Sequence, residues 1–127
     1  METSGLNHVI LTTGDTARSR AFYADVLGFA VQDLADEPGA GFYFVAGATW
    51  FFCSPSRQPV PGDRFSEFRI GLDHLSFTAP SREALEALAA KLKAAGVDTQ
   101  GVEREATGNW YVAFRDPDNI QLEYWLP

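Results

Sequence analysis

The chain has 127 residues, and its 17 acidic and 10 basic side chains give a formal net charge of −7. This length suits a single domain, and an acidic chain without a basic cluster is a poor candidate for binding nucleic acid or an anionic membrane. No apolar run approaches the roughly 20 residues that cross a bilayer, and the N-terminus lacks the pattern of a signal peptide. One cysteine, Cys53, excludes an internal disulfide and a multi-cysteine zinc site. We therefore expect a small cytoplasmic globular domain.

The first strand-like run of the sequence recurs in the second half. Residues 7–12 (NHVILT) and residues 73–78 (DHLSFT) both read polar, His, apolar, variable, apolar, Thr, at an offset of 66 residues. An internal repeat of about half the chain length indicates two similar modules.

A helix and three strands follow the first run. Asp15 or Thr16 can cap a helix that extends to about Leu27 and stops at Gly28. The three β-rich runs are residues 29–33, 41–45 and 49–54, and Gly47 and Ala48 form the hairpin between the last two.

The second run is followed by the same succession of elements. Ser81 caps a helix with an apolar stripe at helical spacing, and Gly96 ends it. The three strands are expected at residues 97–103, 109–115 and 120–125, with a turn at residues 116–119 (DPDN). Residues 55–70, rich in proline and charge, read as a linker.

The predicted fold is α+β, with two tandem βαβββ modules at about residues 5–54 and 71–127. One such module cannot bury both faces of its sheet, whereas two can do so by curving into a shared half-open barrel. The alternative is an unrelated α+β sandwich in which the two histidines match by chance.

Three metal-ligating side chains stand out. His8 and His74 are the only histidines, and they fall at the same position of the repeat. Glu123 lies in an apolar strand, where an unpartnered carboxylate is costly and a divalent cation removes the cost. Two histidines and one carboxylate form a facial triad with open coordination positions, as in catalytic sites. A histidine packed in the core or at the rim, and a rim charge at Glu123, are the alternatives.

The chain resembles the vicinal oxygen chelate superfamily, which includes glyoxalase I, extradiol dioxygenases, methylmalonyl-CoA epimerase and the fosfomycin and bleomycin resistance proteins. In that family the residues matching His8, His74 and Glu123 are the metal ligands. Small family members commonly pair as homodimers. The resemblance covers nearly the whole chain and is carried by residues 5–9 (GLNHV), 21–23 (AFY), 27–29 (LGF), 72–77 (LDHLSF) and 114–123 (FRDPDNIQLE).

The sequence departs from the family in three places. Glyoxalase I and the epimerase have a fourth ligand, Glu or Gln, in the last strand of the first module, and residues 50–53 (WFFC) offer none. Extradiol dioxygenases carry a tyrosine at the position of Ala113 and an additional histidine that is missing here; Tyr111, two residues earlier, is the candidate for the tyrosine's role. Asn119 stands where the turn usually has glycine. The potassium site and cationic pocket of fosfomycin resistance enzymes are not traceable.

Aromatic side chains in the strands are candidate walls of a substrate pocket, and core packing is their alternative role. Arg69, Arg104 and Arg115 either bind an anionic group or are solvated charges. The candidate pocket residues are Trp50, Phe52, Cys53, Trp110, Tyr111 and Trp125.

The leading hypothesis is a divalent-metal enzyme that binds vicinal oxygens of a small apolar or aromatic substrate, with dioxygenase or lyase/isomerase chemistry. Fe2+ is the first choice of metal, and Mn2+, Ni2+ or Zn2+ are alternatives. Glu123 and Tyr111 are the candidate catalytic residues. The second hypothesis is a metal-free binding protein of the bleomycin-resistance type, which sequesters an apolar or aromatic drug between two subunits.

Overall fold

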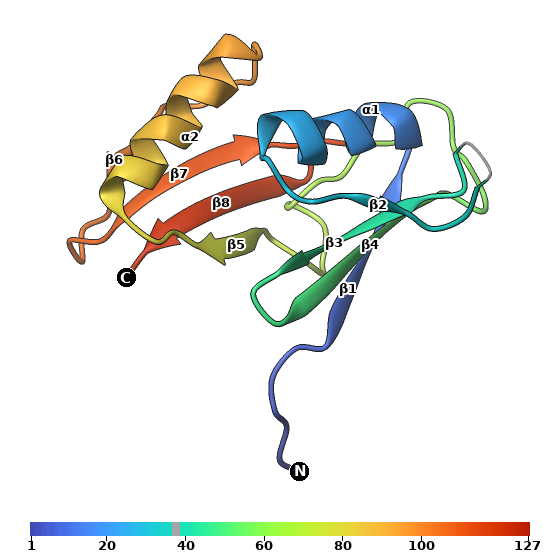
Figure 1. The fold of residues 1–127 in the computed structure, drawn as a ribbon, viewed down its shortest axis with the longest axis horizontal. Helices are drawn as coiled ribbons and strands as arrows, with labels where there is room; N and C mark the ends of the chain where they lie inside the picture. The colour runs from blue at the N-terminus through green and yellow to red at the C-terminus, as the bar shows by residue number, and fades with distance from the viewer. Residues whose placement is uncertain (37–38) are drawn as a thin grey trace. The chain divides into compact units, whose positions relative to one another are not determined.

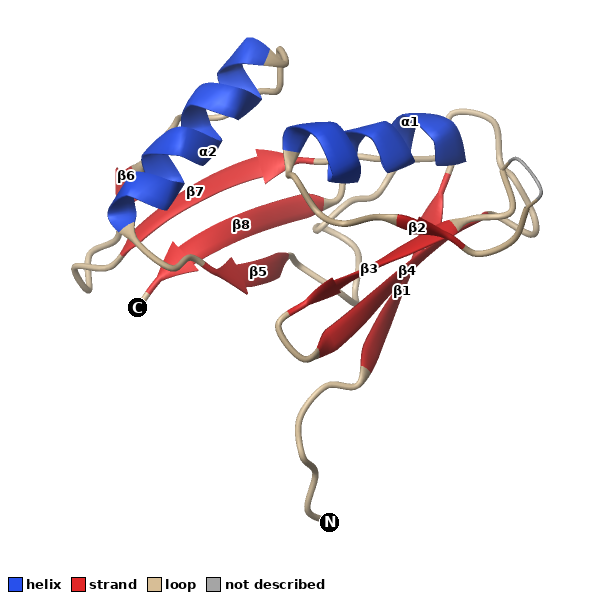
Figure 2. Cartoon of the chain, in the orientation of Figure 1, coloured by secondary structure: helices blue, strands red, loops and turns tan. Residues whose placement is uncertain are grey.

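The computed structural model describes residues 1–36 and 39–127, which form two compact units, Met1–Asp63 and Arg64–Pro127. Each unit holds one four-stranded sheet and one long helical segment (Figures 1 and 2). The boundary between the units falls inside the segment 55–70 that reads as a linker. Its first part therefore belongs to unit 1, and its second part belongs to unit 2.

Unit 1 begins with strand β1 (His8–Thr13). Helix α1 (Thr16–Ala21) continues as the π-helical turn η1 (Phe22–Val26). Three strands complete the unit: β2 (Gln32–Asp33), β3 (Phe42–Ala46) and β4 (Thr49–Pro55). The strand order is β1-β4-β3-β2, in which β1 runs parallel to β4 and the other pairs are antiparallel.

Unit 2 repeats this topology. Its elements are β5 (Leu75–Thr78), α2 (Arg82–Ala94), β6 (Glu103–Arg104), β7 (Trp110–Arg115) and β8 (Gln121–Leu126). The strand order is β5-β8-β7-β6, again with one parallel pair between the first and last strands of the unit. The predicted α+β class and the two βαβββ modules are thus confirmed.

The helix boundaries follow from the capping residues of the sequence. The Asp15 carboxylate accepts a hydrogen bond from the Arg18 amide, and the Ser81 hydroxyl accepts one from the Ala84 amide. At the other ends Gly28 and Gly96 adopt φ angles of 81° and 70°, which suit glycine after a helix. Asp15, rather than Thr16, is therefore the cap of α1.

Strands β2 and β6 are shorter than the runs 29–33 and 97–103 predicted for them. The Phe29 amide donates to the Tyr23 carbonyl at the end of the helix, and the Val31 amide donates back to the Phe29 carbonyl. In unit 2 the Thr99 hydroxyl donates to the Ala113 carbonyl at 2.8 Å. Because such contacts replace the backbone ladder, the first run pairs only at Gln32 and Asp33, and the second only at Glu103, with Arg104 just beyond it.

Each unit buries one face of its sheet beneath its helix. In unit 1 Tyr23 stacks on Phe44 at a ring distance of 5.0 Å, and both are fully buried. In unit 2 the buried Leu85 and Leu92 of α2 belong to the same core as Val112 and Leu122 of the sheet. Because side chains alternate along a strand, the second face of each sheet is left for other roles.

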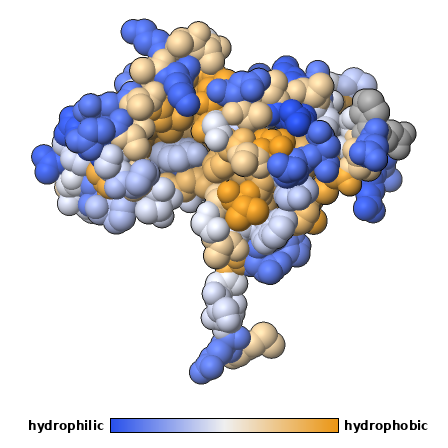
Figure 3. Space-filling view, in the orientation of Figure 1, coloured by the Kyte–Doolittle hydropathy of each residue, from blue (hydrophilic) through white to orange (hydrophobic). Residues whose placement is uncertain are grey.

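Several large apolar side chains remain exposed, and hydrophobic areas lie among hydrophilic ones on the visible surface (Figure 3). No helix of the described residues is long and apolar enough to cross a membrane. The exposed apolar side chains include Ile10, Val45 and Trp50 in unit 1 and Phe68, Ile70 and Leu72 in unit 2.

Candidate functional site

The orientation of Glu123 is decided by strand pairing. Glu123 is the register partner of Ser76 on β5 and of Ala113 on β7, so these residues share one face of the sheet of unit 2. The neighbouring Leu122 is fully buried on the opposite face. We call the face that carries Glu123, Ser76 and Ala113 the Glu123 face. By register it also carries Thr78, Tyr111, Arg115, Gln121 and Trp125.

His74 lies next to Glu123. The distance from His74 Nε2 to Glu123 Oε1 is 3.8 Å. Two ligands bonded to one metal ion at about 2.1 Å each can be at most about 4.2 Å apart. The pair therefore fits a shared divalent cation, and its carboxylate is mostly buried, with 16% of the side chain exposed.

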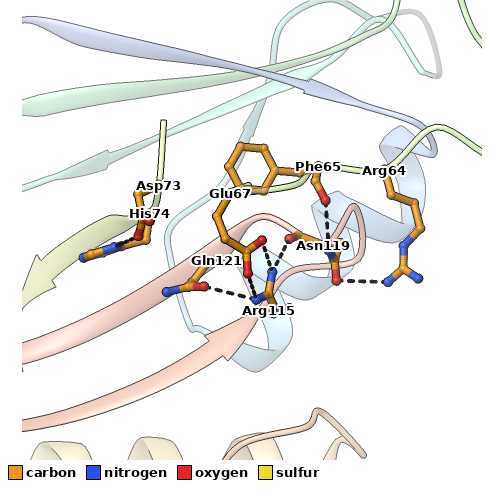
Figure 4. A network of polar contacts seen from close by, with 8 residues as sticks. All are labelled: Arg64, Phe65, Glu67, Asp73, His74, Arg115, Asn119 and Gln121. Carbon is orange, nitrogen blue, oxygen red and sulfur yellow. Dashed lines mark hydrogen bonds and ion pairs between the residues drawn. The ribbon is translucent and has the colours of Figure 1, made fainter. Parts of the chain in front are cut away.

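Asp73 determines which nitrogen of His74 is available. The Asp73 carboxylate lies 2.5 Å from His74 Nδ1, which donates its proton to it (Figure 4). In a neutral imidazole the other nitrogen, Nε2, then keeps its lone pair. Histidine ligands of metals in proteins are held by this kind of bond, which fixes the tautomer and the ring orientation.

The Glu123 carboxylate is also held by a neighbour. Ser76 Oγ donates to Glu123 Oε1 at 2.7 Å, from the position directly across the β5–β8 pair. This bond orients the carboxylate towards the start of β5, where His74 lies.

His8 repeats the arrangement of His74 in unit 1. Its Nδ1 lies 2.8 Å from the Asn7 side-chain oxygen, so Nε2 again keeps the lone pair. His8 belongs to unit 1, whereas His74 and Glu123 belong to unit 2. Within residues 1–36 and 39–127 no group of three or more His, Cys, Asp or Glu side chains is placed to hold a metal ion. Unit 2 by itself thus supplies two of the three predicted ligands.

The position of Glu123 is occupied by Phe52 in unit 1. Ile10 and Ser76 each stand two residues after the histidine of their unit. Ile10 pairs with Phe52, and Ser76 pairs with Glu123. The Phe52 ring meets the His8 ring edge-on at a centroid distance of 6.0 Å. The sheet of unit 1 therefore places an apolar ring where the sheet of unit 2 has a carboxylate.

The six predicted pocket residues do not share a face, because neighbours in a strand point to opposite sides. Trp50 and Phe52 lie on the face of His8 and stack at 6.1 Å, whereas Cys53 is fully buried on the helix-covered face. Cys53 therefore lies on the opposite face of the sheet from the Trp50 and Phe52 rings with which it was predicted to line the pocket.

The same alternation divides the aromatic residues of unit 2. Tyr111 and Trp125 are register partners on the Glu123 face and stack at 6.3 Å. Trp110 lies on the other face, where the guanidinium groups of Arg82 and Arg104 sit 3.7 and 5.3 Å from the ring centroid. Its cation–π contacts give it a packing role.

Tyr111 is held in its protonated form. Burial raises the pKa of its hydroxyl, and the carboxylates of Glu103 and Glu123 raise it further. A neutral phenol beside carboxylates donates a hydrogen bond more readily than it accepts a proton.

Sequence reasoning overlooked Asn7, Asp73 and Ser76 as functional residues. A signal for the first two was present, because each histidine of the repeat follows a polar residue with a side-chain oxygen. No signal in the sequence pointed to Ser76, since its contact depends on the pairing of two strands 47 positions apart.

Comparisons with known proteins identify similar sequences and structures. The model of the Glyoxalase/Bleomycin resistance protein/Dioxygenase superfamily matches residues 5–124. Glutathione transferase FosA of Serratia marcescens is 31% identical over 120 residues, 93% of this chain and 77% of that protein. The 2,2',3-trihydroxybiphenyl dioxygenase of Sphingomonas paucimobilis is 29% identical over 99 residues, 74% of this chain but only 31% of the dioxygenase. A glyoxylase/bleomycin resistance protein/dioxygenase domain from Frankia sp. EAN1pec matches with a TM-score of 0.83 and 30% identity, covering 98% of this chain and 93% of that one.

Proposed function

We propose that this chain, which belongs to the glyoxalase/bleomycin resistance protein/dioxygenase superfamily, is an enzyme that uses one divalent metal ion to bind vicinal oxygens of a small, apolar or aromatic substrate. The observation that carries the proposal is the His74–Glu123 pair. Asp73 fixes the imidazole so that Nε2 keeps a lone pair, and that nitrogen lies 3.8 Å from the Glu123 carboxylate.

The donor set suits a divalent cation. His74 and Glu123 would hold it, and His8, whose ring is oriented by Asn7 in the same way, is our third ligand. One carboxylate with two imidazoles suits iron, manganese, nickel or zinc, and Fe2+ remains our first choice. When bound, such an ion supplies Lewis-acid stabilisation of negative charge on substrate oxygens.

The neighbouring side chains support a role in orienting a substrate. The protonated Tyr111 hydroxyl, which is hydrogen-bonded to Glu103, can donate to a substrate oxygen on the Glu123 face when its proton turns away from that carboxylate. The stacked ring of Trp125 offers an apolar wall on the same face, and Trp50 and Phe52 offer one on the His8 face. A carboxylate such as Glu123, which lies in this mostly buried position, can also accept a proton from the substrate.

The ligand count favours some members of the superfamily over others. A fourth ligand would be expected in unit 1 at the position that corresponds to Glu123. Phe52 occupies this position, and its phenyl ring cannot coordinate a metal. A three-ligand centre with open positions therefore fits better than a four-ligand one. We propose dioxygenase or lyase/isomerase chemistry, and the similarity to a dioxygenase supports the first of these.

The test is metal binding by the purified protein. Protein prepared without chelator should contain close to one equivalent of metal per chain by elemental analysis, and the metal-free protein should bind Co2+. His74→Ala and Glu123→Ala should lose this binding, while Glu86→Gln, a carboxylate on the exposed side of α2, should keep it. Unchanged metal content in both site variants would show that the site is wrong. A metal-free protein that binds bleomycin tightly would support the drug-binding alternative.

We also propose that the chain forms a homodimer, because small members of the superfamily commonly pair. Sedimentation velocity should give a particle of twice the chain mass at micromolar concentration. A particle of single-chain mass at all concentrations would refute the dimer and leave the metal site unaffected.

A further inference from the structure

The segment that leads into β5 is tied to the end of the sheet of unit 2 at which β5 and β8 begin and β7 ends. Residues 64–73 follow the unit boundary and end at Asp73 and His74. Figure 4 shows Arg115 of β7 and Asn119 of the β7–β8 turn reaching towards this segment. The side-chain contacts are polar, and they come from Arg115 and Asn119.

Arg115 makes the first tie. Its Nη2 donates to Glu67 Oε1 at 2.5 Å, and its Nη1 donates to Glu67 Oε2 at 3.1 Å. The same guanidinium donates to the Gln121 side-chain oxygen at 3.1 Å and to the Asn119 carbonyl at 3.2 Å. One side chain on the Glu123 face thus joins the incoming segment, strand β8 and the β7–β8 turn.

Asn119 makes the second tie. Its side-chain amide donates to the Phe65 carbonyl at 2.9 Å, and its side-chain oxygen accepts from Arg64 at 3.0 Å. The Phe65 amide also donates to the Asp118 carbonyl at 3.0 Å. Asn119 has a φ of 70°, a conformation that glycine adopts freely and asparagine tolerates. The asparagine therefore keeps the turn and adds two contacts that glycine cannot make.

The Glu67–Arg115 pair is partly shielded from water. Only 14% of the Glu67 side chain is exposed, against 37% of Arg115. Both terminal nitrogens of Arg115 already donate to acceptors, and Glu67 neutralises the charge. Arg115 is consequently engaged in holding the chain and is not a free cation for a substrate anion.

We propose that Glu67, Arg115 and Asn119 form a latch that positions His74 beside Glu123. The paired β5–β8 strands hold the chain on the C-terminal side of His74, beginning at Leu75. The latch holds it on the N-terminal side. The three are positioning residues, because their hydrogen bonds within the described part of the chain join the incoming segment, β8 and the turn, and not the His74 ring. The metal-related part of this inference rests on the proposed function.

The first experiment measures Co2+ binding to the metal-free full-length protein through the visible absorption of the ion. Arg115→Gln and Glu67→Gln should weaken binding by about 10-fold, as expected when the residues that support metal ligands are removed. Arg115→Lys, which keeps the charge next to Glu67, should recover part of the affinity. Asn119→Gly should weaken binding by less, because the turn and the ion pair remain.

A matched control separates positioning from a general loss of stability. Arg20 and Asp33 form a similar two-point ion pair in unit 1, at 2.7 and 3.2 Å. Arg20→Gln should leave the Co2+ affinity and the absorption spectrum unchanged. Equal Co2+ affinity in Arg115→Gln, Glu67→Gln and wild type would overturn the latch, as would the same loss in the control.

A second measurement does not depend on metal. Amide hydrogen exchange of residues 66–75 should accelerate in Arg115→Gln and Glu67→Gln, while the exchange rates of α2 and β7 stay unchanged. If the wild type binds no Co2+ but this local acceleration is seen, the proposed function fails and the latch stands. Unchanged exchange of residues 66–75 in both variants would overturn the latch whatever the metal result.

Discussion

Glu123 and Phe52 occupy corresponding positions in the two sheets, each opposite the residue that lies two places after a histidine. The two histidines are oriented in the same way, through Nδ1 and the side-chain oxygen of the preceding residue. The two modules therefore both carry the histidine, and only the second carries a carboxylate at the corresponding position. A metal bound by this chain would have a single carboxylate ligand from these two positions.

Ser76 should affect metal binding through Glu123. Ser76→Ala removes the 2.7 Å hydrogen bond to Glu123 Oε1 and frees the carboxylate to rotate. We expect Co2+ affinity to fall several-fold, since such supporting contacts orient metal ligands. A Co2+ titration followed by the visible absorption of the bound ion measures this affinity. Thr78→Ala, on the same strand and the same face, serves as the control and should bind like wild type.

Tyr124 should make the protein sensitive to alkaline pH. Burial raises the pKa of its hydroxyl from an ordinary 10.0 to about 12, so the folded protein favours the neutral phenol. This stabilisation is complete below pH 10 and is lost as the pH rises towards 12; it amounts to roughly 2–3 kcal/mol at most.

Urea unfolding from pH 9 to pH 11.5 tests this assignment. The midpoint should fall more steeply with pH in wild type than in Tyr124→Phe, whose ring keeps its contacts with Phe77 and Phe114. Parallel curves for the two proteins would contradict it.

At the scale of elements, local signals predicted the helices and the turn accurately. Ser81 and Gly96 mark the ends of α2 because caps act within three or four residues. The Asp116 carboxylate accepts from the amides of Asp118 and Ile120, as the turn signal of residues 116–119 indicated. Strands β2 and β6 were overestimated, because a β-rich run does not reveal which of its residues find a partner strand.

The cap of α2 should contribute measurably to stability. Ser81→Ala removes the acceptor for the Ala84 amide, and such losses cost about 0.5–2 kcal/mol. Urea unfolding followed by circular dichroism measures the change. Ser81→Asp, which restores an acceptor at the cap, should unfold like wild type, and an Ala variant that unfolds like wild type would show that the cap is unimportant.

At the scale of the whole molecule, the two units should respond to metal together if His8 is a ligand. Metal at 100 times its dissociation constant should raise the free energy of unfolding by about 2.7 kcal/mol, and His74→Ala should lose this effect. Hydrogen exchange with and without Co2+ locates the stabilised residues. Protection around His8 as well as around His74 supports the three-ligand set, whereas protection in unit 2 alone would remove His8 from it.

The sequence by itself determined the repeat, the α+β class, the caps, the turn at residues 116–119 and the three candidate ligands, because these signals are local or recur at a constant offset. Only the tertiary structure decided that Glu123 shares a face with Ser76 and Tyr111 and that Cys53 and Trp110 do not line the faces of the candidate site. It also joined Glu67 to Arg115, 48 positions apart in the sequence. A strand exposes two faces in alternation, and only its partner strands and its helix determine which face is buried.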